Sequence, residues 1–177
     1  KALEFLQKAL EINKVLNDRF LEASILGNLG AIYQDLCQHE EALKYHTEAL
    51  AITIEIGDRR GEGVHLGRLG TIYQILGEYE KAVDSHGEAL DITREIGDKR
   101  GEGTHLGAIG IVYHKLGQNE EAIKYYEDAH RITRDIGDKK GEGVHLGNIG
   151  FIYQSLGQYE DAIKSYEEAL KITREIG

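Results

Sequence analysis

Three stretches of the sequence carry the glycine content of a phosphate-binding loop. They are GEGVHLGRLG at 61–70, GEGTHLGAIG at 101–110 and GEGVHLGNIG at 141–150, with four glycines in each. A phosphate-binding loop needs a strand before the glycines and a helix after them, and a P-loop ends in Lys followed by Ser or Thr. Helical patterns flank each stretch on both sides here, and the Lys-Ser/Thr ending is absent. We therefore expect these stretches to be helical, with glycines that serve packing.

Histidines recur inside these stretches and raise the question of a metal site. His65, His105 and His145 are 40 residues apart. Neighbouring helices lie roughly 10 Å apart, whereas the nitrogen ligands of one zinc ion each lie about 2 Å from it. The three histidines cannot share an ion, and we interpret them as packing between repeats. His39 and His46 lack a third ligand, so the sequence predicts no metal and no cofactor.

The single cysteine, Cys37, precedes His39 by two residues, and such a pair could supply a thiol nucleophile and its base. Cys37 stands where later repeats have Gly77, Gly117 and Gly157, which indicates a tight turn, and no third group is placed to orient the histidine. We find no constellation of acid, base and nucleophile elsewhere, so we predict that the chain is not an enzyme. One cysteine excludes an internal disulfide and fits a reducing, cytoplasmic compartment.

These residues recur because the whole sequence repeats every 40 residues. The repeated columns include tyrosines at 33, 73, 113 and 153, leucines at 36, 76, 116 and 156, and alanines at 42, 82, 122 and 162. Each repeat holds two stretches whose apolar residues are spaced by three and four, which is typical of an α-helix. Left-handed C-caps are expected at Gly57 and its equivalents and at Asn17, with Asp58 and its equivalents as N-caps.

We therefore predict an all-α array of about nine helices. The boundaries are a second helix of a truncated repeat at 1–16 and full helix pairs at 17–56, 57–96, 97–136 and 137–177. A lone pair cannot bury its apolar face, so neighbouring pairs must stack on one continuous core. Gly63, Gly67 and Gly70 share one helical face, and each costs about 1 kcal/mol relative to alanine. Close approach of a neighbouring helix is the expected compensation.

This pattern resembles the tetratricopeptide repeat (TPR) family. Residues 69–89 supply its signature in Leu69, Gly70, Tyr73, Gly77, Tyr79, Ala82, His86 and Ala89. The 40-residue period is similar to the long-helix subclass of LGN-type adaptors, kinesin light chains and bacterial multidomain signalling proteins. The resemblance implies a right-handed superhelical solenoid of antiparallel helix pairs. Its concave groove, lined by the first helices, would hold a peptide or a segment of another protein.

Positions that vary from repeat to repeat mark the surface where a ligand would bind. On the first helices they form a variable stripe, which runs through positions 24, 28, 31 and 35 and their equivalents, beside a column of Gln or His. The predicted groove residues are Asn28, Gln34, Asp35, Arg68, Thr71, Gln74, Ile111, His114, Lys115, Asn148, Phe151 and Gln154. The alternative is that these residues are solvated surface only; we favour binding.

Several of these residues suit particular ligand groups. The resemblance implies that Asn28 and Asn148 hold the main-chain amides of a ligand. Arg68 is suited to a ligand carboxylate, and Ile111 with Phe151 would form an apolar pocket. The mixed Arg, Lys and Asp content does not reproduce the all-basic carboxylate clamp of some TPR proteins, so we do not expect a chaperone tail as the ligand.

The charge of the chain limits its partners. Its 177 residues carry a formal net charge of −10 at pH 7, which argues against nucleic acid and anionic membranes as partners. Basic pairs recur at 59–60, 99–100 and 139–140, between Asp58 and Glu62 and their equivalents. We interpret this edge as locally neutralised, with an acidic or phosphorylated partner as the alternative.

The sequence as a whole predicts a non-catalytic scaffold that binds a protein or peptide segment. The chain begins at Lys1 and contains no Met, which indicates a fragment of a larger adaptor or signalling protein. The alternative function is an architectural spacer or self-assembly module that acts through end-to-end stacking of repeats. Leu3, Leu6 and Leu10 of the first helix favour this alternative, because they would lack their natural neighbour.

Overall fold

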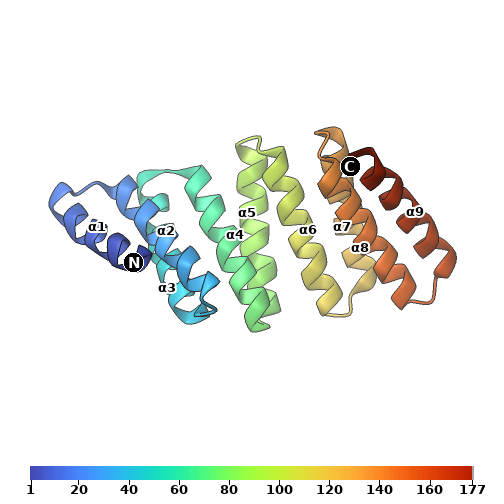
Figure 1. Cartoon of the computed structure of the whole chain (residues 1–177), viewed down its shortest axis with the longest axis horizontal. Helices are drawn as coiled ribbons and strands as arrows, with labels where there is room; N and C mark the ends of the chain where they lie inside the picture. Colours follow the sequence, from blue (N-terminus) through green and yellow to red (C-terminus); the bar gives the residue numbers. More distant parts are fainter. Residues whose placement is uncertain (177) are drawn as a thin grey trace. The chain divides into compact units, whose positions relative to one another are not determined.

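The computed structural model describes residues 1–176, and within that range the chain forms nine α-helices and no strand (Figure 1). They are α1 (Ala2–Leu16), α2 (Arg19–Asp35), α3 (His39–Ile56), α4 (Arg59–Leu76), α5 (Tyr79–Glu95), α6 (Lys99–Lys115), α7 (Asn119–Asp135), α8 (Lys139–Ser155) and α9 (Tyr159–Ile176). The predicted all-α fold is confirmed, and the glycine-rich stretches lie inside α4, α6 and α8. None of these described helices is both long enough and apolar enough to cross a bilayer.

The helices end at left-handed residues in the places that the sequence predicted. Asn17 has a φ of 51° and Cys37 a φ of 57°, where the other boundaries have glycines with φ between 71° and 77°. Only glycine adopts this conformation without strain, and asparagine tolerates it best among the others. Cys37 therefore occupies a turn position, as its place in the glycine column indicated.

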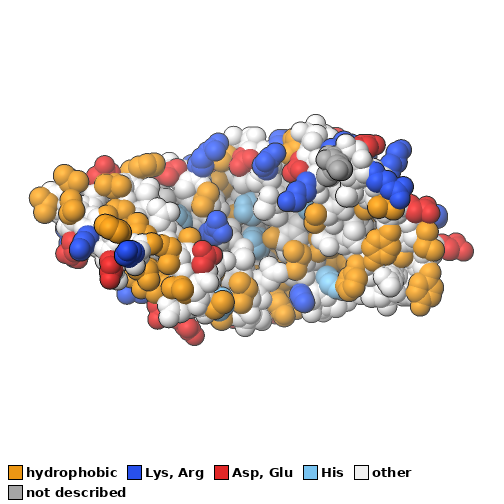
Figure 2. Space-filling view, viewed as in Figure 1, with side chains coloured by type: hydrophobic (Ala, Val, Ile, Leu, Met, Phe, Trp, Pro, Cys, Tyr) orange, Lys and Arg blue, Asp and Glu red, His pale blue; other side chains and the backbone are white. Residues whose placement is uncertain are grey.

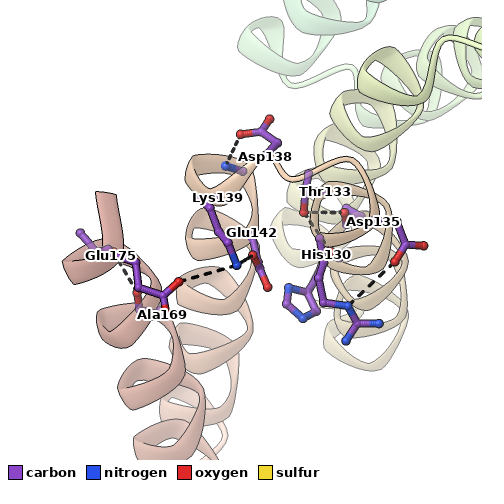
Figure 3. Close-up of polar contacts among 12 residues, drawn as sticks. His130, Thr133, Asp135, Asp138, Lys139, Glu142, Ala169 and Glu175 are labelled. Atoms are coloured by element: carbon purple, nitrogen blue, oxygen red, sulfur yellow. Dashed lines mark hydrogen bonds and ion pairs between the residues drawn. The ribbon is translucent and has the colours of Figure 1, made fainter. Parts of the chain in front are cut away.

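Aspartates cap the first helix of each pair. The carboxylate of Asp58 accepts a hydrogen bond from the amide of Gly61 at 2.9 Å, and Asp98 and Asp138 repeat the contact at 3.0 Å with the equivalent glycines. Figure 3 shows the Asp138 contact. Each cap satisfies an amide that has no partner within the helix, which typically contributes about 1 kcal/mol. The predicted N-caps are confirmed.

The chain divides into two compact units, Lys1–Ile92 and Thr93–Gly177. In the first unit, Ala23 and Leu26 of α2 pack on Ala49 and Ile52 of α3. In the second unit, Ala122 and Tyr126 of α7 pack on Ile149 and Ile152 of α8. The small alanines let the helices approach closely, so the cores consist of aliphatic and tyrosine side chains between successive helices.

Rings pack on the glycines of two repeated positions in the first helices. A Cβ atom built at Gly30 would lie 2.8 Å from the ring of His46 in α3, and one at Gly110 would lie 3.1 Å from the ring of Tyr126 in α7. Gly27 instead faces the next first helix, where a Cβ would lie 2.7 Å from Cε1 of His65. The expected close approach is confirmed at Gly63, where a Cβ would lie 3.1 Å from Ile92, and at Gly70, where it would lie 2.8 Å from the His86 ring.

Gly107→Ala and Gly147→Ala are a matched pair at equivalent positions of α6 and α8. A Cβ at Gly107 would lie 2.6 Å from Cε1 of His145, whereas a Cβ at Gly147 meets no described neighbour within 4 Å. We expect Gly147→Ala to raise the free energy of unfolding by about 1 kcal/mol and Gly107→Ala to lower it by about 1–3 kcal/mol. Urea unfolding followed by circular dichroism measures both; stabilisation by both would contradict the packing role.

Candidate functional site

A cavity of about 630 Å³ lies between the first helices α2 and α4 in the unit Lys1–Ile92. Ser24, Asn28 and Ala31 of α2 line it, and Val64 and Arg68 of α4 line it from the other side. All five belong to the variable stripe that the sequence marked as a ligand surface. The structure therefore brings Asn28 and Arg68 of the predicted groove to one hollow, which we call the α2–α4 cavity.

Several residues of the α2–α4 cavity are absent from the sequence-based site. Phe20 and Arg60 line the cavity near the start of each first helix, and His46 and His65 line it where α3 and α4 meet. Phe20 and Arg60 are equivalent positions that differ in residue type, which is the signal that identified the rest of the stripe. His46 could not be identified in this way, because the residues at its repeated position, His46, His86, Tyr126 and Tyr166, have the pattern of core packing.

The basic pairs at the inter-repeat turns are only half neutralised. The first cation of each pair reaches the glutamate one turn on: Arg59 to Glu62 at 2.7 Å, Lys99 to Glu102 at 2.7 Å and Lys139 to Glu142 at 3.1 Å. Figure 3 shows Lys139 between Glu142 and, at 3.8 Å, Glu175 of α9. Among the described residues, the second cation of each pair makes no ion pair; these are Arg60, Arg100 and Lys140.

Glu102 shows that these glutamates are held by the cations rather than by solvent. The residue is 6% exposed. Burial acts to raise the pKa of the Glu102 carboxyl, but hydrogen bonds from Lys99 and Arg94 outweigh it, and the pKa is lowered. The carboxylate is therefore charged and satisfied within unit Thr93–Gly177 and is not a free acid for chemistry.

Two buried histidines meet beside the α2–α4 cavity. Nδ1 of His46 lies 3.4 Å from Nδ1 of His65, and the two residues are 2% and 7% exposed. Burial, followed by the neighbouring His65 and the charge of Arg68, lowers the pKa of His46 to about 4. Burial also lowers the pKa of His65, with Asp58 opposing and Arg68 assisting the shift. Both rings are thus neutral at pH 7, and one of the facing nitrogens must be a donor.

The first helices of the second unit, α6 and α8, present a more apolar surface. Ile111 and Phe151 are exposed, and the ring of His114 meets the Phe151 ring edge-on at 5.6 Å between centroids. Nδ1 of His114 lies 2.8 Å from Oδ1 of Asn119, which fixes the ring. His114 and Phe151 of the predicted groove are therefore in contact, and Asn148 lies on the same helix as Phe151.

The remaining predicted groove residues lie outside the α2–α4 cavity. The Thr71 hydroxyl donates to the carbonyl of Gly67 in its own helix at 3.0 Å, and the Gln154 amide oxygen accepts from the Tyr166 hydroxyl at 3.0 Å. Gln34 and Gln74 are half-buried, whereas Asp35, Ile111 and Lys115 are exposed. Gln154 thus makes a hydrogen bond within its own repeat, and the role of the Gln/His column in binding stays a prediction.

The described residues do not form a metal-binding cluster. Within residues 1–176, no three side chains of His, Cys, Asp or Glu come close enough together to hold an ion. His65 packs on Gly27 and His145 on Gly107, so these histidines make the contact between repeats that the sequence predicted.

The first and last helices expose apolar side chains. On α1 the exposed residues include Phe5, Ile12 and Val15; on α9 they include Ile163 and Leu170. The prediction that Leu3, Leu6 and Leu10 lack a neighbour is wrong, because all three are half-buried and Leu10 packs on the core between α2 and α3. Figure 2 shows hydrophobic side chains over both helices. In the repeat before α9, the equivalent residues of α7, Ile123 and His130, are half-buried under α8. The α9 face is one that the next repeat covers elsewhere in the chain, whereas the equivalents of Phe5 and Ile12 in α3 pack on α2 of their own repeat.

Comparison with known proteins agrees with the repeat pattern. The tetratricopeptide repeat family matches residues 1–55, 21–95, 62–135 and 145–174. No curated protein matches the sequence. BtubC from P. vanneervenii is 20% identical with a TM-score of 0.90, covering 98% of this chain and 72% of that one.

Two further solved structures are similar over nearly the whole chain. A Rap protein complexed with competence and sporulation factor is 20% identical with a TM-score of 0.82, covering 97% of this chain and 48% of that one. A signal transduction ATPase with a tetratricopeptide repeat sensor, from Pyrococcus horikoshii, is 27% identical with a TM-score of 0.87. The match covers 97% of this chain and 27% of the ATPase, so the chain spans less than half of either protein. These likenesses establish an all-α repeat-solenoid fold.

Acidification should destabilise the fold through its buried histidines. The pKa of His46 and that of His145 fall from 6.5 to about 4 in the folded chain. Between these values the unfolded chain binds more protons than the folded one, so stability decreases as pH falls from 6.5 towards 4. Each histidine should cost about 2 kcal/mol at pH 5. His46→Tyr copies Tyr126, which already packs against His145.

Urea unfolding at pH 7 and pH 5 measures this effect in the wild type and in His46→Tyr. We expect the variant to lose about 2 kcal/mol less stability than the wild type over this interval, because the contribution of the His46 ring is gone while the other buried histidines remain. An equal loss in both proteins would show that His46 is not held neutral by its burial.

Proposed function

Because this chain belongs to the tetratricopeptide repeat family, we propose that it is a non-catalytic scaffold whose first helices bind a peptide or a segment of another protein. The α2–α4 cavity is the observation that carries the proposal. It lies on the stripe of residues that vary between repeats, and its volume of about 630 Å³ is of the size that small ligands and side chains fill.

The chemistry of the α2–α4 cavity suits a polypeptide ligand. Asn28 can donate to and accept from a main-chain amide at once, and it is exposed on the cavity wall. Phe20 and Val64 remain 63% and 54% exposed beside it. A bound segment that covers these side chains would remove apolar surface from water, which favours binding by about 25 cal/mol per Å² before the ordering costs are counted.

The exposed surface of α6 and α8 extends the same proposal to the second unit. Ile111 and Phe151 would hold an apolar side chain of the ligand, and Asn148 would hold its main chain as Asn28 does in the first unit. The comparison structures support a binding role, since one similar Rap protein is complexed with a factor and another similar protein uses its tetratricopeptide repeats as a sensor.

We also place the chain in the cytoplasm, in a larger adaptor or signalling protein with a right-handed superhelical array. Cys37 is exposed and is the one cysteine of the sequence, so it has no intramolecular partner for a disulfide. A free exposed thiol suits a reducing compartment. The array would leave its first helices facing the groove, and the repeat boundaries at 17–56, 57–96, 97–136 and 137–177 define its units.

A second candidate function is self-assembly through the ends. The exposed Phe5, Ile12 and Val15 of α1 and the exposed Ile163 and Leu170 of α9 support it, because stacking would remove their apolar surface from water. In this case the chain would act as an architectural spacer.

Selection from a displayed library of cellular peptides tests the binding proposal. We expect peptides with a shared motif, and we expect Asn28→Ala/Asn148→Ala to lose them because the main-chain contacts are gone. The free energy of unfolding should stay within about 1 kcal/mol of the wild-type value, since surface substitutions rarely cost more. Gln7→Ala/Gln158→Ala removes two exposed amides from α1 and from the turn before α9 and should bind normally. Selection that ignores both Asn residues would count against a groove ligand.

Light scattering over a concentration series tests self-assembly separately. If the ends stack, the average mass rises with concentration, and Ile163→Lys/Leu170→Lys abolishes the rise by charging the α9 face. A constant monomer mass would exclude this function and leave peptide binding unaffected.

A further inference from the structure

Two arginines in the α2–α4 cavity are without an anionic partner. Arg60 and Arg68 both line it, and within the described part of the chain neither side chain makes a hydrogen bond or an ion pair. Both are exposed and thus able to move towards a ligand. By contrast, the neighbouring Arg59 is held by Glu62 at 2.7 Å. We propose that Arg60 and Arg68 bind carboxylates of an extended acidic peptide, which deepens the proposed function and rests on it.

The positive field of the α2–α4 cavity reaches its buried wall. After burial, the charge of Arg68 is among the causes that lower the pKa of His46 and His65. An anion placed beside the Arg68 guanidinium would interact favourably with the same charge. The two arginines of this cavity contrast with the net charge of −10 of the whole chain.

Asp58, the one acidic side chain among the cavity residues, opposes the charge of Arg68 at His65, and there its effect on the pKa is the larger of the two. Asp58 lines the cavity, but its carboxylate accepts the amide of Gly61 at 2.9 Å as the N-cap of α4. The positive end of the α4 dipole partly offsets the Asp58 charge at that point. The cavity residues therefore include two cations and one carboxylate, which leaves one positive charge in excess.

The spacing of the arginines predicts the spacing of the ligand carboxylates. Arg60 and Arg68 are eight residues apart on α4, which separates their Cα atoms by about 12 Å. An extended peptide advances about 3.3 Å per residue, so acidic residues three or four positions apart would match them. Phe20 and Val64 border the same cavity and would contact an apolar residue between or beside the acidic pair.

The rest of the chain shows that Arg68 is particular to this cavity. The equivalent residues are Asn28, Ala108 and Asn148, so the repeat fold does not need an arginine there. Bidentate pairing with a carboxylate is what arginine offers and asparagine does not. Arg68→Asn therefore installs a residue that the fold already accepts at two equivalent positions.

The experiment uses a phage-displayed library of random twelve-residue peptides against three proteins: wild type, Arg60→Gln/Arg68→Asn and the control Arg100→Gln. Arg100 occupies the position of Arg60 in the second unit and is likewise exposed without an ion pair among the described residues. We expect the wild type and Arg100→Gln to enrich peptides with two acidic residues three or four positions apart. The double variant should lose that enrichment.

Synthetic versions of one enriched peptide then test whether its carboxylates account for the affinity. Replacing both acidic residues by their amides should weaken binding to the wild type by about tenfold or more, as measured by fluorescence anisotropy. The same change should have little effect on binding to Arg60→Gln/Arg68→Asn. This ligand-side comparison holds even if the double variant folds poorly.

Two other outcomes separate this inference from the function on which it rests. Enriched peptides that lack acidic residues but depend on Asn28 and Asn148 would overturn the acidic ligand and leave groove binding intact. No enriched peptide for any of the three proteins would overturn both.

Discussion

Rings that rest on glycines hold each first helix against its neighbours, and the other contacts of the fold depend on this packing. His46 lies over Gly30 within one repeat, and His65 lies over Gly27 between two repeats. A Cβ atom at either glycine would overlap the ring, so the helix preference that glycine forfeits, about 1 kcal/mol per residue, is offset by close packing. Tyr126 over Gly110 makes the same contact in the second unit.

This packing determines which surface is free for a ligand. In α2 and α6 the glycines pack against neighbours on two sides of the helix. The polar residues at the start of the first helices are held by the aspartate caps and by ion pairs such as Arg59 with Glu62. The stripe that remains can change without cost to the fold. In one unit the stripe contains Asn28 and Arg68; in the other it contains Phe151, which contacts His114 of the adjacent Gln/His column. One scaffold thus presents a cationic hollow and a more apolar surface.

Much of the fold could be predicted because it depends on local rules repeated four times. The spacing of apolar residues, the left-handed Asn17 and the Asp58 cap each need only a few neighbouring residues. The site was less predictable because it depends on side-chain placement between repeats. Arg59 and Arg60 are adjacent in sequence, yet only Arg59 reaches Glu62, and Arg60 lines the cavity. The contact of His46 with His65 likewise joins columns that look independent in the sequence.

A crystal structure of the chain with a selected peptide would test the central claim most directly. The account predicts an extended peptide between α2 and α4, with its main chain on Asn28 and a carboxylate on Arg68. A peptide bound on the second helices, or on the exposed faces of α1 or α9, would contradict it.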